Sequence, residues 1–213
     1  MVRINKVHTG VGDKGHTTHL DGSHVSKSDS RLDVVGTIDE LNSIIGIVQM
    51  ELQRMPTTTN DGGPRATVLK VQSHAGKKLA NLQQELFDFG AECSTSPQNI
   101  PSGMEVLQDD VCERLLDEMN EWLGEIQPLS SFILPTGNPV VAHLHLARTV
   151  TRRVERKLAM LRDQNGDDSV RMFSLSYINR LSDWLFVLSR WITTTLGEDE
   201  TLWLPLAGRE KID

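Results

Sequence analysis

Apolar residues recur three and four positions apart along five stretches of the chain, which is the pattern that an amphipathic helix produces. Polar segments rich in proline, glycine or serine separate these stretches. Asn138 followed by Pro139 is typical of a helix N-cap with proline at the first helical position. No segment shows sustained strand alternation. The pattern predicts an all-α fold, a five-helix bundle with helices expected over residues 31–52, 68–89, 111–123, 139–161 and 175–192.

The first 30 residues lack this pattern and are rich in glycine, serine, threonine and histidine, so we expect an ordered loop or an arm. Residues 10–15 read GVGDKG and match the pattern G-x-G-x-x-G. A dinucleotide fingerprint needs a surrounding strand–helix–strand unit, and a Walker A loop needs another residue order, so neither is predicted. Backbone N–H groups of a glycine-rich loop can still bind oxyanions. The alternatives are a phosphate-binding loop of another kind and a flexible terminus.

Length and charge narrow the class of protein. A chain of 213 residues is expected to form one domain (1–213), with an arm (1–30), a helical bundle (31–197) and a C-terminal tail (198–213). The net charge of −7 disfavours general nucleic-acid binding, and no apolar run approaches the ~18 residues of a membrane span. Two cysteines are too few for a disulfide framework and favour a reducing compartment. We therefore expect a cytoplasmic location, or the mitochondrial matrix if a presequence has been removed.

The fourth predicted helix carries the clearest candidate site. Arg148, Arg152 and Arg156 are spaced four apart and so share one helix face. Arginine forks suit carboxylate and phosphate oxygens, so this face is a candidate anion site. The alternative is a solvated basic stripe laced with Glu155.

Two other helices carry polar residues near their apolar stripes. Asp39 lies at the edge of the first stripe, where a carboxylate needs a partner, and an arginine of the fourth helix is the natural candidate. The alternative is an exposed, unpaired Asp39. Asn179, Ser182 and Asp183 share one face of the fifth helix, which fits either polar packing between helices or a ligand site.

No metal centre is assigned from the sequence. His143 and His145 point about 200° apart on a helix and cannot chelate one metal. His16 and His19 could approach a metal but lack a companion ligand. A di-iron centre needs Glu-x-x-His motifs, and the chain has none.

Four stretches together resemble one family. They read TGVGDKGHTT followed by Lys27, VGTIDELN, FILPTG followed by ARTVTRRVER, and YINRLSDWLFVLSR. In this order they closely resemble the PduO-type ATP:cob(I)alamin adenosyltransferases, from about Lys6 to Trp191. The resemblance implies a five-helix bundle that assembles as a homotrimer, with ATP and the corrinoid bound between subunits. The implied reaction transfers the 5′-deoxyadenosyl group of ATP to Co(I) of reduced cobalamin and releases triphosphate, assisted by Mg²⁺. It further implies a cobalamin reductase and an adenosylcobalamin-dependent enzyme as partners.

The resemblance also assigns roles to individual residues. Asp39 and Arg148 match a salt bridge across the subunit interface, and Phe132 matches the aromatic residue on the lower face of the corrin. Asn179 matches a residue at the nucleotide and corrinoid site. The ATP-binding positions implied are Thr9, Gly10, Val11, Gly12, Thr17, Thr18, Lys27, Arg152, Arg153, Glu155 and Arg156.

The chain departs from the family pattern in three places. Val11 stands where a threonine is usual, so one hydroxyl donor is missing, and Thr136 stands where glycine is common. The linker over residues 56–65 is longer than usual. A corrinoid- or ATP-binding escort with little catalysis is therefore an alternative function, and a purely structural helical bundle is another.

Overall fold

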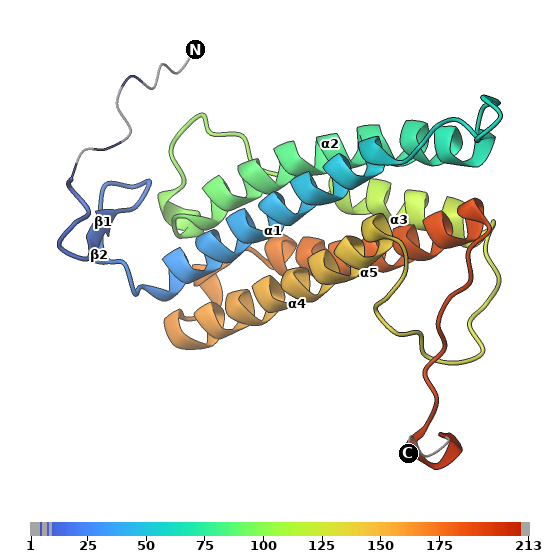
Figure 1. The fold of residues 1–213 in the computed structure, drawn as a ribbon. Coiled ribbons are helices and arrows are strands. Elements are labelled where there is room, and N and C mark those ends of the chain that lie inside the picture. The colour runs from blue at the N-terminus through green and yellow to red at the C-terminus, as the bar shows by residue number, and fades with distance from the viewer. Residues whose placement is uncertain (1–4, 6–7, 9, 210–213) are drawn as a thin grey trace.

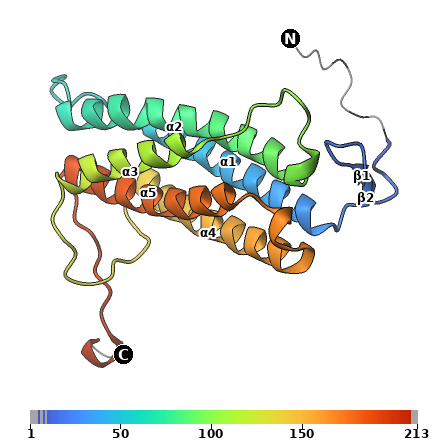
Figure 2. The ribbon, with the colours of Figure 1, turned by 180° about the vertical axis from the view of Figure 1, so that it is seen from behind.

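The computed structural model describes residues 5, 8 and 10–209, and it is built around five long helices (Figures 1 and 2). The five-helix bundle is therefore confirmed. The helices begin and end within a few residues of the predicted ranges. Their bounds are Ser30–Arg54 (α1), Ala66–Cys93 (α2), Asp109–Leu123 (α3), Pro139–Asn165 (α4) and Met172–Leu196 (α5), with single-turn 3₁₀ helices at Pro97–Asn99 (η1), Asp167–Ser169 (η2) and Leu206–Gly208 (η3).

Local chemistry sets the ends of these helices. The Asp29 carboxylate accepts from the Arg31 N–H and caps α1. The Asn138 side chain accepts from the Val141 N–H and caps α4, as the sequence predicted. Gly197 follows α5 with φ of 71°, the left-handed conformation that glycine adopts without strain.

The helices pack so that α4 contacts both α1 and α5, while α2 packs on α1 and α3 on α5 (Figure 2). Trp122, Trp184 and Trp191 are fully buried where α3 meets α5, with the Trp122 ring centroid 5.2 Å from that of Trp184 and 6.0 Å from that of Trp191. These tryptophans are packing residues. No helix in the described part of the chain is both long and apolar enough to cross a membrane.

A cluster of charged residues joins α2, α3 and α5 at the edge of this core. Glu118 on α3 accepts from the indole N–H of Trp184 at 2.7 Å and pairs with Lys78 on α2 at 2.8 Å. Arg114, one turn earlier, pairs with Glu118 at 3.3 Å and with Glu85 on α2 at 2.6 Å. Because these contacts give the buried Trp184 N–H an acceptor and join α3 to α2 and α5, they fix the position of α3.

The arm departs from the prediction that the chain contains no strands. Residues His16–Thr18 (β1) and His24–Ser26 (β2) pair antiparallel as a short hairpin, with Thr17 opposite Val25. Strands of three residues are too short to show alternation in a sequence, which is why the pattern missed them.

Replacing Glu118 tests the charged cluster. Glu118→Ala leaves the Trp184 N–H and Lys78 without their acceptor, and we expect it to lower the free energy of unfolding by about 2 kcal/mol. Urea unfolding followed by tryptophan fluorescence measures this loss. Glu121→Ala is the control, because Glu121 lies on the same helix with a half-exposed side chain and should change stability by less than about 0.5 kcal/mol. Equal losses in both variants would contradict the role of the cluster.

Candidate active site

Helix α4 presents three arginines, spaced four apart, on one side of the molecule. Arg148 is half-buried, whereas Arg152 and Arg156 are exposed. A groove of about 330 Å³ lies beside the first two, between α4, α5 and the segment that precedes α4. The structure thus brings together groups that the sequence singled out separately. The groove is lined by Arg148, Arg152, Leu129, Phe132, Ile133, Ser182, Asp183 and Phe186.

The guanidinium of Arg148 lies over an aromatic ring, with its central carbon 5.9 Å from the ring centroid of Phe186. Its Nε atom is buried and has no hydrogen-bond partner among the described residues. Burial lowers the pKa of Arg148, and the neighbouring charge of Arg152 lowers it further. Two cations therefore share the groove, and neither forms an ion pair within the described part of the chain. This arrangement favours an anionic ligand or partner.

The adjacent side of α4 is used differently. Arg153 pairs with Glu40 of α1, and Lys157 pairs with Asp33 of α1. These ion pairs join the two helices. Arg153 is thus engaged within its own chain, and a role in ATP binding would require this pair to open.

Glu155 does not neutralise the arginine face. Its side chain is half-buried and forms no ion pair in the described part of the chain, while Arg156 donates from Nη1 to the carbonyl oxygen of Arg152 at 3.1 Å. Glu155 therefore does not lace this face, although Arg152 and Arg156 are exposed as the alternative of a solvated stripe expects.

Asp39 does not pair with an arginine of α4 in the same chain, so that expectation is wrong for the single subunit. Asp39 is exposed, and the neighbouring Glu40 takes Arg153 instead. Successive helical residues point about 100° apart, so Asp39 faces away from α4. It lines a groove of about 330 Å³ between α1 and α2, beside Phe87, whose side chain is 72% exposed. Pairing of Asp39 across a subunit interface stays a prediction.

In the arm, the glycine loop and Lys27 come together. A Cβ at Gly12 would lie 2.9 Å from the Lys27 Nζ, so glycine lets the ammonium approach the backbone. The Lys27 N–H also donates to the Gly15 carbonyl at 2.8 Å, and Gly10 and Gly15 have positive φ of 73° and 79°. Val11 is 71% exposed in the same loop. The arm residues predicted to bind ATP therefore form one structured loop, with Thr17 and Thr18 in β1 and Thr9 outside the described residues.

The polar face of α5 is divided. Ser182 is buried and donates to the Asn179 carbonyl at 2.9 Å, whereas Asp183 is exposed, and both Ser182 and Asp183 line the groove beside α4. Asn179 lies one turn earlier, exposed on α5 and outside that lining.

The segment that carries Phe132 is held by the C-terminal tail, a contact that the sequence analysis missed. Phe132 is 80% exposed. Its carbonyl accepts from the Trp203 N–H at 2.7 Å, and the Leu134 N–H donates to the Thr201 carbonyl at 2.8 Å. The rings of Phe132 and Trp203 meet edge to face with centroids 6.2 Å apart. The tail thus sets the position of Phe132 at the groove.

A buried arginine fixes both segments to α5. Arg190 is 7% exposed, and it donates from Nε to Glu200 of the tail at 2.7 Å and from Nη2 to the Gln127 carbonyl at 2.8 Å. An arginine within the apolar stretch of the fifth helix is the one sequence signal that could have indicated this clamp.

The comparisons with known proteins agree with one another. A family model described as cobalamin adenosyltransferase matches residues 7–192. A corrinoid adenosyltransferase of Mycobacterium leprae is 36% identical over 96% of this chain and 98% of its own length, and a cobalamin adenosyltransferase of Cupriavidus metallidurans is 34% identical over 94% and 95%. The chain belongs to the cobalamin adenosyltransferase family.

A solved structure supports the same assignment. A variant PduO-type ATP:corrinoid adenosyltransferase from Lactobacillus reuteri, complexed with cobalamin and ATP, matches with a TM-score of 0.77 and 27% identity, covering 93% of this chain and 99% of that chain. The resemblance read from the four motifs is therefore confirmed, and the chain is an ATP:corrinoid adenosyltransferase.

Several histidines of this adenosyltransferase contact other groups of the protein. His16 shares a hydrogen bond with the Lys14 carbonyl at 3.1 Å, and His19 lies 3.7 Å from Asp29. Burial, followed by the charge of Arg148, lowers the pKa of His145 to about 4, so this ring is neutral at pH 7. Within the described part of the chain, no three His, Cys, Asp or Glu side chains gather closely enough to hold a metal ion.

Removing Glu200 tests the clamp on the Phe132 segment. Glu200→Ala takes away the charged partner of Arg190, and we expect the amides of Leu134 and Trp203 to exchange hydrogen about tenfold faster because the tail detaches more often. Asp199→Ala is the matched control, since the neighbouring Asp199 is exposed and forms no described hydrogen bond. Unchanged exchange at both amides in Glu200→Ala would refute the clamp.

Proposed function

We propose that this chain transfers the 5′-deoxyadenosyl group of ATP to Co(I) of reduced cobalamin, releasing triphosphate, in the groove beside α4. The observation that carries the proposal is the pair of arginines, Arg148 and Arg152, that share the groove with an exposed Phe132 and have no described ion-pair partner. A site with unneutralised cations next to an apolar surface suits a polyphosphate and a flat macrocycle together.

The chemistry of the reaction explains which groups are needed. Co(I) attacks C5′ of ATP, and the C5′–O bond breaks with its electron pair leaving on triphosphate. The cobalt atom is the nucleophile, so the protein need not supply one. Negative charge grows on the leaving triphosphate, and prearranged cations and N–H donors lower that barrier. Arg152, Arg156 and the glycine loop with Lys27 are proposed for this task.

Phe132 is proposed to act on the corrinoid. Its exposed ring would occupy the lower face of the corrin and exclude an axial ligand from cobalt. Loss of that ligand makes Co(II) easier to reduce to Co(I). Support comes from its position at the mouth of the groove and from the tail that holds its backbone in place.

We further propose that two subunits of a homotrimer complete each site. No hydrogen bond or ion pair among the described residues joins the arm to Arg148, Arg152 or Arg156, and the hairpin lies beyond the first turn of α1 (Figure 1). Asp39 and Arg148 lie on different faces and are both unpaired within the described chain, which fits a salt bridge between subunits.

Mg²⁺ is proposed as the assisting ion. Mg²⁺ is usually bound through one or two carboxylates together with substrate phosphates and water, so a cage of protein ligands is not required. We propose Glu155, which forms no ion pair in the described part of the chain and neighbours Arg152 and Arg156 in the sequence, as the carboxylate that contacts it. When bound, the ion would neutralise charge on the triphosphate.

The product and its precursor indicate further partners. A cobalamin reductase would supply the Co(I) form, and an adenosylcobalamin-dependent enzyme would receive the product. A cytoplasmic location is proposed, and the free thiols of Cys93 and Cys112 support a reducing compartment.

Arginine replacement tests the proposed activity. Arg152→Ala and Arg156→Ala should each reduce ATP-dependent adenosylation by about 10²-fold or more, because each removes a cation from the proposed triphosphate site. The assay follows chemically generated cob(I)alamin by its spectrum as it becomes alkylcobalamin with ATP and Mg²⁺, together with triphosphate release. Arg162→Ala is the control, since Arg162 lies on the same helix but pairs with Asp167. Full turnover in the first two variants would disprove the site, and binding without turnover by the unaltered protein would favour the escort.

Replacing Phe132 separates the two substrates. Phe132→Ala should slow the reduction of bound Co(II) much more than it weakens ATP binding, because only the corrinoid meets this ring. Stopped-flow reduction and ATP titration measure the two effects. Leu206→Ala is the matched control, because Leu206 is likewise 80% exposed but lies outside the groove. Equal effects of Phe132→Ala on both steps would argue against its assigned role.

A further inference from the structure

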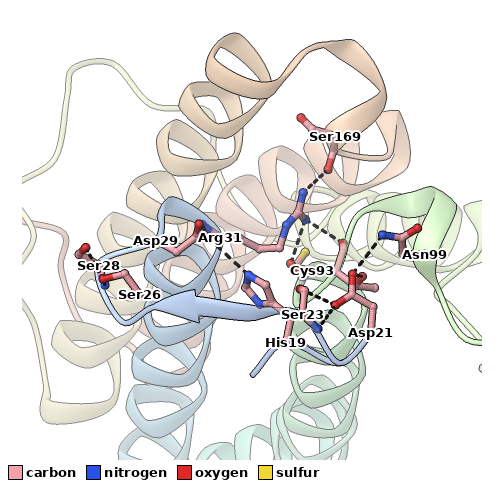
Figure 3. Close-up of polar contacts among 11 residues, drawn as sticks. His19, Asp21, Ser23, Ser26, Ser28, Asp29, Arg31, Cys93, Asn99 and Ser169 are labelled. Atoms are coloured by element: carbon pink, nitrogen blue, oxygen red, sulfur yellow. Dashed lines mark hydrogen bonds and ion pairs between the residues drawn. The ribbon is translucent and has the colours of Figure 1, made fainter. Parts of the chain in front are cut away.

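The tip of the arm hairpin is tied to the helical bundle by one carboxylate (Figure 3). Asp21 lies in the turn between β1 and β2, where Gly22 has a positive φ of 85°. Its Oδ1 atom accepts from the Ser23 N–H at 2.9 Å and from the Ser23 hydroxyl at 2.6 Å. Its Oδ2 atom accepts from the Asn99 side-chain amide at 3.0 Å and from the Thr95 hydroxyl at 3.3 Å. One side chain therefore both shapes the turn and docks it on the segment that follows α2.

These hydrogen bonds keep Asp21 ionised. The pKa of Asp21 is lowered to about 2, chiefly by the hydrogen bonds from Ser23, with smaller contributions from Asn99 and Thr95. A lowered pKa means that the contacts persist from neutral pH down through the usual titration range of aspartate and are lost as the pH falls toward 2.

The docking surface is itself held rigidly. Arg31 is 9% exposed at the start of α1, and its guanidinium donates to the carbonyl oxygens of Cys93 at 3.2 Å, Thr95 at 2.8 Å and Ser169 at 2.8 Å. Figure 3 shows this arginine beside the Asp21 contacts. Thr95 accepts from Arg31 and donates to Asp21. Through Arg31, the position of the hairpin tip is therefore fixed relative to α1, the end of α2 and η2.

The other end of the hairpin carries the glycine loop. The Lys27 N–H donates to the Gly15 carbonyl at 2.8 Å, and the Lys27 ammonium lies against Gly12. β2 leads through Lys27 to Asp29, the N-cap of α1. The loop is thus attached at two points, the α1 N-terminus and the Asp21 contacts. Without the second attachment, the hairpin would be held only at the α1 N-terminus, where His19 lies 3.7 Å from Asp29.

We propose that Asp21 is a positioning residue for triphosphate binding, which holds the glycine loop and Lys27 in the orientation that meets the substrate. This proposal rests on the proposed function of the groove and arm. Asp21 does not touch the substrate and acts through the hairpin.

Steady-state kinetics of Asp21→Ala test the proposal. The KM for ATP should rise about tenfold, while kcat at saturating ATP and the unfolding midpoint change little, because bound triphosphate can still order the arm. Asn99→Ala should raise the KM in part, because it removes only one of the hydrogen bonds to Asp21. The double variant should be no worse than Asp21→Ala, because that variant already lacks the Asn99 contact. In Asp21→Ala the amides of Lys27 and His19 should also exchange hydrogen faster, whether or not ATP is turned over.

Asp61→Ala is the matched control. Asp61 occupies another glycine-containing turn, where it accepts from Thr59, but it lies in the linker between α1 and α2. It should leave both KM and arm exchange unchanged. An unaltered KM in Asp21→Ala, or a parallel loss of kcat and stability, would overturn the positioning role. Absence of adenosylation by the unaltered protein would instead overturn the proposed function, while amide exchange would still decide whether Asp21 holds the arm.

Discussion

The 3.6-residue repeat of α4 divides its charged residues between two tasks, and the candidate site depends on that division. Apolar positions of α4 pack between α1 and α5 and fix the rotation of the helix. With that rotation set, Arg153 and Lys157 face α1 and find carboxylates there, while Arg148 and Arg152 face the groove and find none. Neighbouring basic residues of α4 therefore have different roles. The first pair stabilises the bundle, and the second pair is left available to an anion from outside the chain.

Much of this arrangement could be predicted from the sequence because it follows from local periodicity. The five helices, the cap at Asn138 and the shared face of the three arginines depend on spacings of three and four residues. Asp39 shows where such reasoning ends. The sequence shows that Asp39 lies next to the apolar stripe of α1. Whether Asp39 or Glu40 pairs with an arginine depends on how α1 is rotated against α4, and no local pattern encodes that rotation.

The parts that could not be predicted are those in which distant segments meet. Trp203 lies more than seventy residues from Phe132, and Asp21 meets Asn99 across 78 positions. Neither pairing has a periodic signature, because single backbone bridges and single side-chain contacts leave no repeat in the sequence. Arg190, an arginine within the apolar stretch of the fifth helix, and Arg31, at the start of the first helix, carry only a weak signal in the sequence. Both turn out to donate to backbone carbonyls, a role that depends on loops whose paths are set by the tertiary fold.

Two parts of the proposed site, the Phe132 segment and the glycine arm, are each positioned through a buried arginine. Arg190 fixes the segment that presents Phe132, and Arg31 fixes the segment on which the glycine arm docks. In each case a largely buried guanidinium satisfies carbonyls that would otherwise lack partners, so the irregular segments become almost as well placed as the helices. Arg148 in the groove differs from these two arginines. Its Nε atom is buried but has no hydrogen-bond partner among the described residues. Arg31 and Arg190 have hydrogen-bond partners within the described chain, whereas Arg148 and Arg152 form no ion pair there, and that contrast separates the scaffold of this fold from the groups left to act on a ligand.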